Sequence, residues 1–292
     1  MTNLSPLRYP GGKNKTYEYV RHLILQHDIR TYIEPFAGGA AVALRLLINK
    51  DVERIIINDY DRSIYSLWNV IKNNPESLIK LIQKTPITMD QWYLQKNIQI
   101  EKETADELSL AFSTLFLNRT NFSGIIKAGV LGGKNQNGVN KIDCRFNKNS
   151  IIKRIEQIAA FGDRIKVCNY DAKDFIEEEI KHTRKSLTFF DPPYYKRGPE
   201  LYTDFYTHDD HVELAKAIKT QMRNRFWILT YDIANEIEKL YSKHEYEKYY
   251  LNYSVAKPTH GQEFIFFSKK INPGNINDYL RLVMPETHSL KN

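Results

Sequence analysis

The sequence predicts an α/β fold in which a mostly parallel sheet carries an inserted, mainly helical domain. Apolar runs of strand length alternate with amphipathic helical stretches along most of the chain, which is the pattern of βαβ units. The alternation stops between residues 73 and 149, where helical stretches lead into a segment rich in Gly, Asn and Lys. The predicted core therefore comprises 1–72 and 150–272, with 73–149 as an insertion and 273–292 as a tail.

The individual elements follow from run length and periodicity. Six apolar runs are short enough to be strands, at 31–36, 53–59, 164–169, 187–191, 225–232 and 263–268. Four amphipathic stretches are typical of helices, at 40–48 and 64–71 in the core and at 75–83 and 104–116 in the insertion.

Composition favours a soluble globular protein with no membrane segment. Of the 292 residues, 42% are hydrophobic and 26% are charged, which is ordinary for globular domains. The N-terminus has no apolar signal core, and Arg45 interrupts the longest apolar run, so the cytoplasm is the expected location. Cys144 and Cys168 lack metal-ligand spacing with His, and we expect reduced thiols and no metal site.

The net charge of +7 is concentrated in one segment. Residues 118–154 contain eight basic residues and one acid, Asp143, so the rest of the chain is balanced. Such a concentration favours contact with a polyanion, although a solvated loop could carry the same lysines.

The stretch YIEPFAGGAAV, residues 32–42, indicates a nucleoside site. It predicts a strand, a glycine turn and a helix start, and Gly38 and Gly39 would allow a ligand to approach the backbone closely. About twenty residues on, Asp59 ends the next strand, where an acid can bind ribose hydroxyls. The alternatives are that the small residues serve packing and that Asp59 caps the helix after it.

The stretch FFDPPYY, residues 189–195, indicates a site for a planar amine. The Asp191 carboxylate and the Pro192 carbonyl could both accept its N–H groups, while Tyr194 stacks on the ring. This arrangement favours a pyramidal nitrogen whose lone pair can attack an electrophilic methyl group. The alternative is a capping role for Asp191 in a proline turn.

Together these motifs resemble the DNA adenine-N6 methyltransferases of the Dam type, the D12 class. The resemblance rests on PLRYPGGK at 6–13, EPFAGG at 34–39, IINDYD at 56–61, DPPY at 191–194 and EFIFFS at 263–268. It implies a Rossmann-like core that binds S-adenosylmethionine, with a target-recognition domain inserted before DPPY.

The resemblance also assigns residues to roles. DPPY, which comprises Asp191, Pro192, Pro193 and Tyr194, corresponds to the catalytic motif. Asp171 matches an acid that contacts the adenine of the cofactor, although Ala172 stands where an aromatic residue is common and Asp174 is an alternative. The expected cofactor-binding residues are Tyr9, Lys13, Glu34, Phe36, Ala37, Gly38, Gly39, Asp59 and Asp171.

The stretch LNRTNFSGI, residues 117–125, resembles the loop by which such enzymes contact and enter the duplex. Arg119 and Asn121 could read base edges and Phe122 could act as a wedge, while a phosphate contact for Arg119 and a core position for Phe122 are the alternatives. The expected DNA-binding residues are Arg119, Asn121, Phe122, Lys127, Lys134, Lys141 and Arg145.

These expectations combine into one function, the transfer of a methyl group from S-adenosylmethionine to N6 of an adenine flipped out of double-stranded DNA. The rivals are an N4-cytosine DNA or RNA adenine methyltransferase, a non-catalytic nucleic-acid-binding relative and a nicotinamide-dependent oxidoreductase. Asp191 favours adenine, since enzymes acting on cytosine N4 commonly have Ser there. A cognate restriction nuclease is a possible partner, and the sequence indicates neither the recognition site nor the oligomeric state.

Overall fold

The computed structural model describes residues 4–9, 13–196, 206–252 and 260–283. Its centre is a seven-stranded sheet with the order β3-β2-β1-β4-β5-β7-β6. The first five strands in the chain are parallel, and the last two form an antiparallel hairpin at one edge. The strands are β1 (Thr31–Glu34), β2 (Arg54–Asn58), β3 (Ile165–Cys168), β4 (Ser186–Phe190), β5 (Phe226–Asp232), β6 (Tyr246–Asn252) and β7 (His260–Phe267).

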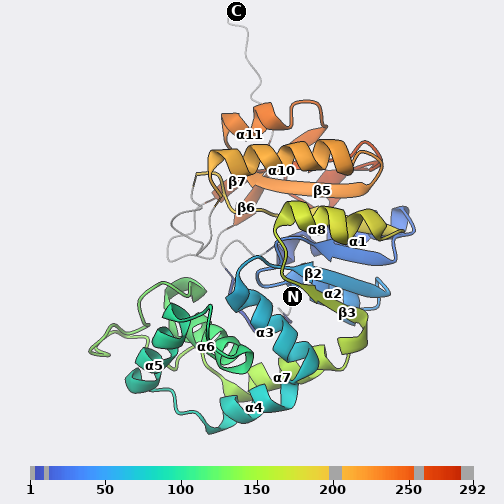
Figure 1. The fold of residues 1–292 in the computed structure, drawn as a ribbon. Coiled ribbons are helices and arrows are strands. Elements are labelled where there is room, and N and C mark those ends of the chain that lie inside the picture. Colours follow the sequence, from blue (N-terminus) through green and yellow to red (C-terminus); the bar gives the residue numbers. More distant parts are fainter. Residues whose placement is uncertain (1–3, 10–12, 197–205, 253–259, 284–292) are drawn as a thin grey trace, which may run out of the picture.

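Helices cover both faces of the sheet (Figure 1). One apolar core joins the sheet to α1 (Tyr17–Gln26), α2 (Ala41–Ile48) and α3 (Arg62–Asn73). The other joins it to α8 (Ala172–Glu178), α10 (His208–Gln221) and α11 (Asn235–Leu240). Adjacent strand residues alternate between the two cores, as Tyr32 and Ile33 do, because successive side chains point to opposite faces.

The predicted α/β fold class is confirmed, and all six predicted strands overlap observed ones. The remaining strand, β6, was not predicted. Its sequence, YEKYYLN, places charged residues among tyrosines and lacks the apolar run of a buried strand. It lies at the sheet edge, where one side needs no partner strand.

The insertion is helical, as expected, and packs against the core helix α3 (Figure 1). Its helices are α4 (Pro75–Lys84), α5 (Met89–Ile100) and α6 (Glu107–Thr120), and α7 (Lys148–Ala159) leads back to the sheet. The predicted boundary at 72/73 falls at the end of α3, and the boundary at 149/150 falls in the first turn of α7.

Part of the predicted tail belongs to the core. Ile276 and Leu280 are buried, and Leu282 pairs with Tyr249 of β6 in an antiparallel bridge. The Tyr279 ring stacks on His22 of α1. These apolar contacts fix residues 273–283 against the sheet, so the expectation of a tail there is wrong.

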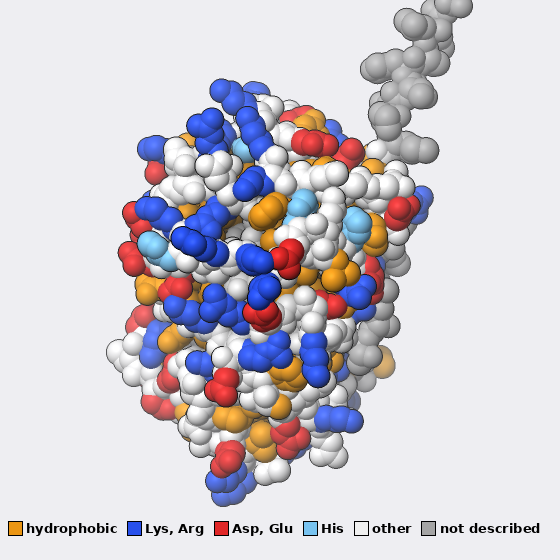
Figure 2. Space-filling model, turned by 90° about the vertical axis from the view of Figure 1, so that its right-hand side faces the viewer, with side chains coloured by type: hydrophobic (Ala, Val, Ile, Leu, Met, Phe, Trp, Pro, Cys, Tyr) orange, Lys and Arg blue, Asp and Glu red, His pale blue; other side chains and the backbone are white. Residues whose placement is uncertain are grey.

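Basic side chains are not confined to the insertion. Figure 2 shows Lys and Arg spread over the side of the molecule that lies to the right in Figure 1, with acidic side chains among them. The net excess, however, belongs to residues 118–154. Within the described ranges, no helix has the length and apolar character needed to cross a membrane.

Candidate active site

The glycine turn after β1 is held in place from two neighbouring elements. The Gly38 amide donates to Oδ2 of Asp59 over 2.8 Å, and the Gly38 carbonyl accepts from Nε1 of Trp68 on α3 over 2.9 Å. Gly38 has φ of +43°, which glycine adopts without strain. Asp59 therefore shapes the turn, and since each carboxylate oxygen has two lone pairs, it can still accept a hydroxyl.

Tyr9 of the N-terminal motif packs directly on this turn. A Cβ atom at Gly38 would lie 2.5 Å from Cζ of Tyr9, and one at Gly39 would lie 2.9 Å from the Tyr9 Cβ. Only residues without side chains fit beneath the ring. The two segments, far apart in the sequence, thus form one cradle; residues 10–12 of the same motif lie outside the described residues.

Asn58 locks the ends of three strands together and was not predicted. It is 1% exposed, its amide donates to the carbonyls of Pro35 and Tyr170, and its oxygen accepts from the Tyr170 amide. The sequence feature that could have identified Asn58 is its position beside Asp59 at the end of IIIND. This clamp sets the position of the adjacent Asp59.

Glu34, at the end of β1, faces α2 rather than open space. It is buried, and Oε1 accepts from the Ala43 amide over 3.2 Å. Burial raises the pKa of Glu34 to about 8. Its observed contact fixes the start of α2, which follows the glycine turn.

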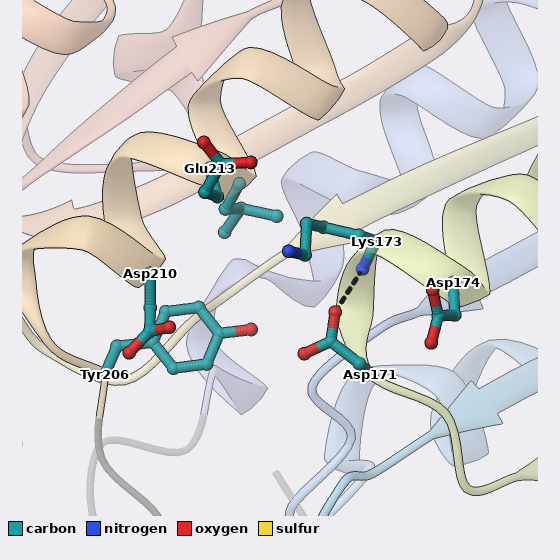
Figure 3. Close-up of a pocket in the computed structure, with 7 residues that line it drawn as sticks. Asp171, Lys173, Asp174, Tyr206, Asp210 and Glu213 are labelled. Carbon is teal, nitrogen blue, oxygen red and sulfur yellow. Dashed lines mark hydrogen bonds between the residues drawn. The ribbon is translucent and has the colours of Figure 1, made fainter.

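Asp171 and Asp174 line the same pocket of about 200 Å³, between the start of α8 and the start of α10 (Figure 3). Asp171 caps α8 by accepting from the Lys173 amide. Tyr206 lines the opposite side and meets the ring of Phe36 edge-on at 5.7 Å. The pocket thus adjoins the glycine turn, and its geometry does not choose between the two acids. Its lining residues are Asp171, Lys173, Asp174, Tyr206, Asp210, Glu213 and Leu214.

Asp191 follows the last residue of β4, where parallel strands present their carboxyl ends. Its Oδ1 accepts from the Thr230 hydroxyl over 2.6 Å and from Nζ of Lys13 over 2.9 Å. Among the described residues, none donates a hydrogen bond to Oδ2, and the side chain is 27% exposed. Burial raises the pKa of Asp191, while Lys13 and the hydroxyl act in the opposite direction. The carboxylate is therefore anchored through one oxygen, and the other is left to accept a ligand.

The ring of Tyr194 is buried, with 4% exposure. Nζ of Lys13 lies 5.3 Å from its centroid, and its hydroxyl donates to Oε1 of Glu263 over 2.7 Å. Stacking on an adenine thus requires neighbouring groups to move. The hydroxyl also has a buried partner, so the ring is not its only functional part. Pro192 and Pro193 complete the turn.

Glu263 was not among the predicted site residues. It lies on β7, is fully buried, and accepts from Tyr194 and, over 2.7 Å, from Tyr249. Lys13 approaches both of its oxygens, at 3.5 and 3.4 Å. The signal in the sequence was an acid at the head of the apolar run EFIFFS, a position where an apolar residue is the norm.

The expectation that Asn121 reads a base edge is not supported by its contacts. Its side chain is fully buried, its oxygen accepts from Nε1 of Trp92 over 2.7 Å, and its amide donates to the carbonyls of Ile125 and Ile126. Because every contact lies inside the insertion, Asn121 shapes the loop from within.

Arg119 is also held by the fold. Its Nε donates to the carbonyl of Pro6 over 2.7 Å, and burial, together with the nearby Arg154 and Arg8, lowers the pKa of Arg119 to about 10. It ties the N-terminal segment to α6. Asn118 does the same, since it exchanges hydrogen bonds with the Arg8 backbone and donates to the Gly124 carbonyl.

The remaining predicted DNA contacts lie on the outside of the insertion. Phe122 is 53% exposed, and Lys127, Lys134, Lys141 and Arg145 are exposed. Lys141 donates to the Gln136 carbonyl.

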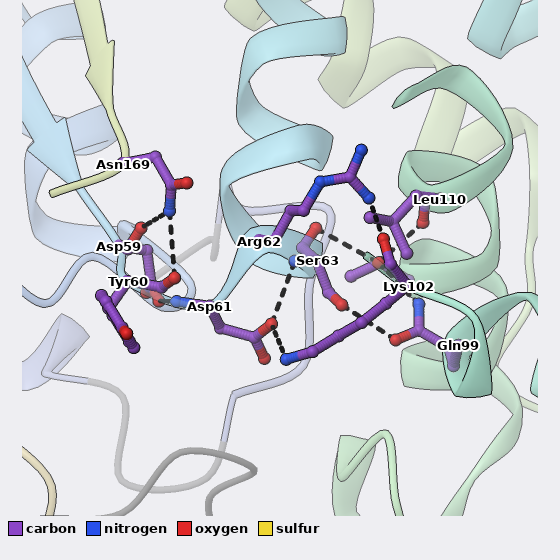
Figure 4. Close-up of polar contacts among 10 residues, drawn as sticks. Asp59, Tyr60, Asp61, Arg62, Ser63, Gln99, Lys102, Leu110 and Asn169 are labelled. Carbon is purple, nitrogen blue, oxygen red and sulfur yellow. Dashed lines mark hydrogen bonds and ion pairs between the residues drawn. The ribbon is translucent and has the colours of Figure 1, made fainter. Parts of the chain in front are cut away.

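A polar seam connects the insertion to the loop that carries Asp59 (Figure 4). Asp61 donates from its amide to Oδ1 of Asp59 over 3.0 Å, and its carboxylate accepts from Lys102 over 3.3 Å. Arg62 donates to the Ala105 carbonyl in the turn before α6. The insertion is thereby fixed to the same strand end that shapes the glycine turn.

The sheet order, with its glycine turn after β1 and DPPY after β4, is that of a Rossmann-like methyltransferase. The model of the D12 class N6 adenine-specific DNA methyltransferases matches residues 9–251, and the chain belongs to this family.

Similarity to individual proteins is low in identity but broad in coverage. The chain is 24% identical to Type II methyltransferase M1.LlaDCHI of Lactococcus lactis subsp. cremoris over 84% of this chain and 88% of that protein. It is 23% identical to Type II methyltransferase M.MjaIII of Methanocaldococcus jannaschii over 72% and 77%. It is 22% identical to the DNA adenine methylase of Vibrio cholerae over 75% and 77%.

Proposed function

We propose that the protein is a site-specific DNA methyltransferase that transfers the methyl group of S-adenosylmethionine to N6 of an adenine flipped out of double-stranded DNA. Membership of the D12 class supports adenine methylation of DNA. The observation that carries the proposal is the one-sided support of Asp191, whose Oδ1 is held by Thr230 and Lys13 while Oδ2 lacks a hydrogen-bond donor among the described residues.

This arrangement suits an exocyclic amine. The lone pair of adenine N6 is delocalised into the ring, so the amine is a weak nucleophile. Oδ2 of Asp191 and the Pro192 carbonyl would accept its two hydrogens and favour a pyramidal nitrogen. Because Lys13 and Thr230 fix the carboxylate beforehand, little reorganisation is needed during the reaction.

S-adenosylmethionine would supply an electrophilic methyl group on its sulfonium. The residues described above fit such a group. In the turn from Phe36 to Gly39, Gly38 and Gly39 present bare backbone beneath Tyr9, and the Asp59 carboxylate would accept ribose hydroxyls. The pocket beside Asp171 and Asp174 adjoins this turn and would take the adenine ring.

The insertion would bind the duplex. Lys127, Lys134, Lys141 and Arg145 are exposed and suit phosphate contacts, and the exposed Phe122 suits a wedge between bases. Flipping is required because N6 cannot reach a methyl donor from inside the base stack. The Type II names of two relatives make a restriction–modification pair with a cognate nuclease the context we propose.

Expression in a bacterial host without DNA methylation, followed by modification-sensitive sequencing, tests this function. We expect N6-methyladenine at one sequence motif in cells that make the wild type and none in cells that make Asp191→Ala. N4-methylcytosine would establish the cytosine alternative. Unmodified DNA in cells that contain folded wild-type protein would favour a non-catalytic relative.

A further inference from the structure

We propose that Glu263 is a positioning residue of the DPPY site, acting through Tyr194 and Lys13; this inference rests on the function proposed above. Glu263 lies on β7, opposite Asp232 of β5 and Tyr249 of β6. It is fully buried, and the residues after it, Phe264 to Phe267, are all apolar.

A buried carboxylate at this place calls for a reason other than packing. Moving a carboxylate out of water destabilises a fold by several kcal/mol unless other groups compensate. An apolar residue would continue the pattern of β7 without this penalty. The compensating groups therefore indicate what the carboxylate is for.

Within the described part of the chain, the groups seen to compensate come from three distant segments. Tyr194 donates to Oε1 and Tyr249 to Oε2, each over 2.7 Å, and Lys13 lies within 3.5 Å of both oxygens. Two of these partners belong to the proposed amine site, since Tyr194 is part of DPPY and Lys13 contacts Asp191. Glu263 thus joins the N-terminal motif to DPPY, although Lys13 and Tyr194 are 181 residues apart in the sequence.

The first consequence is that Tyr194 is fixed at its far end. A tyrosine held only by its backbone can rotate about two side-chain bonds, whereas the hydrogen bond to Glu263 selects one orientation of the ring. The ring is the group proposed to stack on the flipped adenine, so its orientation sets the pose of the base.

The second consequence concerns Asp191. Lys13 lies 2.9 Å from Oδ1 of Asp191 and is shared with Glu263. The second carboxylate adds a restraint on the ammonium group to the one that Asp191 provides. The position of Oδ2, which faces the substrate, therefore depends on Glu263 although the two carboxylates share no hydrogen bond.

The test compares Glu263→Gln, Tyr194→Phe and the double variant with the wild type in steady-state methyl transfer to duplex DNA. Tyr246→Phe is the matched control, because it also removes a tyrosine–glutamate hydrogen bond, but to Glu238, which is not one of the site residues. Thermal unfolding of every variant is measured in parallel.

We expect Glu263→Gln and Tyr194→Phe each to lower kcat by about ten- to a hundredfold, the effect of misplacing reacting groups by about 1 Å. KM for DNA and cofactor should change far less. If Glu263 acts through Tyr194, the double variant should have a kcat close to that of the worse single variant. Tyr246→Phe should retain full kcat while losing stability.

Three outcomes would overturn the inference. They are a kcat within about twofold of wild type in Tyr194→Phe, fully additive losses in the double variant, and equal losses in Tyr246→Phe. If Glu263→Gln does not fold, the comparison of Tyr194→Phe with Tyr246→Phe decides alone. If the wild type methylates no adenine, both the proposed function and this inference are wrong. If the wild type is active and the variants keep its kcat, only the inference is wrong.

Discussion

Replacing Gly38 with alanine tests whether the N-terminal motif and the glycine turn form one cofactor cradle. The new Cβ atom would lie 2.5 Å from Cζ of Tyr9, about 1 Å inside the ordinary contact distance of carbon atoms. With φ at +43°, the added side chain also strains the backbone by about 1–2 kcal/mol. The ring must move by about 1 Å, and we expect cofactor affinity to fall at least about tenfold, or ~1.4 kcal/mol.

The chain offers a control that separates strain from contact. Gly133 also has a positive φ, +74°, but a Cβ atom there meets nothing within 4 Å. Gly133→Ala should therefore lose stability through strain alone and bind the cofactor normally. In Gly38→Ala, removing the Tyr9 ring as well should relieve the clash, so the effects of the two substitutions on stability should not add.

Calorimetric titration with S-adenosylhomocysteine measures the cofactor affinity, and chemical unfolding measures the stability. Equal cofactor affinity in Gly38→Ala and Gly133→Ala would refute the cradle. So would strictly additive losses of stability for Tyr9→Ala and Gly38→Ala, since additivity means that the two sites do not interact.

Three further predictions concern single side chains. Asp191→Ala should lower kcat on the order of a hundredfold or more, because it removes an acceptor that acts in the transition state, while cofactor and DNA binding persist; a loss below about tenfold contradicts this role. Asn121→Ala should destabilise the fold by about 1–3 kcal/mol, since it leaves buried partners unpaired. Lys134→Ala should instead lower the affinity for cognate and scrambled duplexes alike and flatten the salt dependence of binding. If Asn121→Ala loses sequence preference at unchanged stability, Asn121 does read a base. Burial raises the pKa of Glu34 from 4.5 to about 8. Between these pH values the folded protein holds a proton that the unfolded chain has released, so the free energy of unfolding should fall as pH rises. Glu34→Gln should remove that fall, and urea unfolding that gives the two proteins the same pH dependence between pH 5 and 8 would contradict the prediction.

The sequence was informative wherever function depends on local geometry. Asp191 was expected at a strand end because two prolines directly follow the predicted strand 187–191, and β4 ends at Phe190. The glycine turn was expected because two adjacent glycines follow a strand, and Gly38 does adopt a positive φ. In both cases the causes lie within a few residues of each other.

Features that depend on distant partners could not be read in this way. Asn121 was expected to read a base edge because no residue near it in the sequence indicates its contact with Trp92, which lies on α5 and donates a hydrogen bond to it. Glu263 was predicted only as the first residue of the strand 263–268, because its partners Lys13 and Tyr194 come from other motifs. The burial of Ile276 and Leu280 likewise depends on tertiary packing rather than on local pattern.

The most direct test of the central claim is mass spectrometry of nucleosides from unmethylated duplex DNA after incubation with purified protein and methyl-labelled S-adenosylmethionine. If Asp191 and Pro192 bind an adenine amine, the wild type should produce labelled N6-methyldeoxyadenosine, and Asp191→Ala, at equal cofactor affinity, should produce almost none. Label in N4-methyldeoxycytidine, or no labelled nucleoside from a folded wild type that binds both DNA and cofactor, would contradict the account.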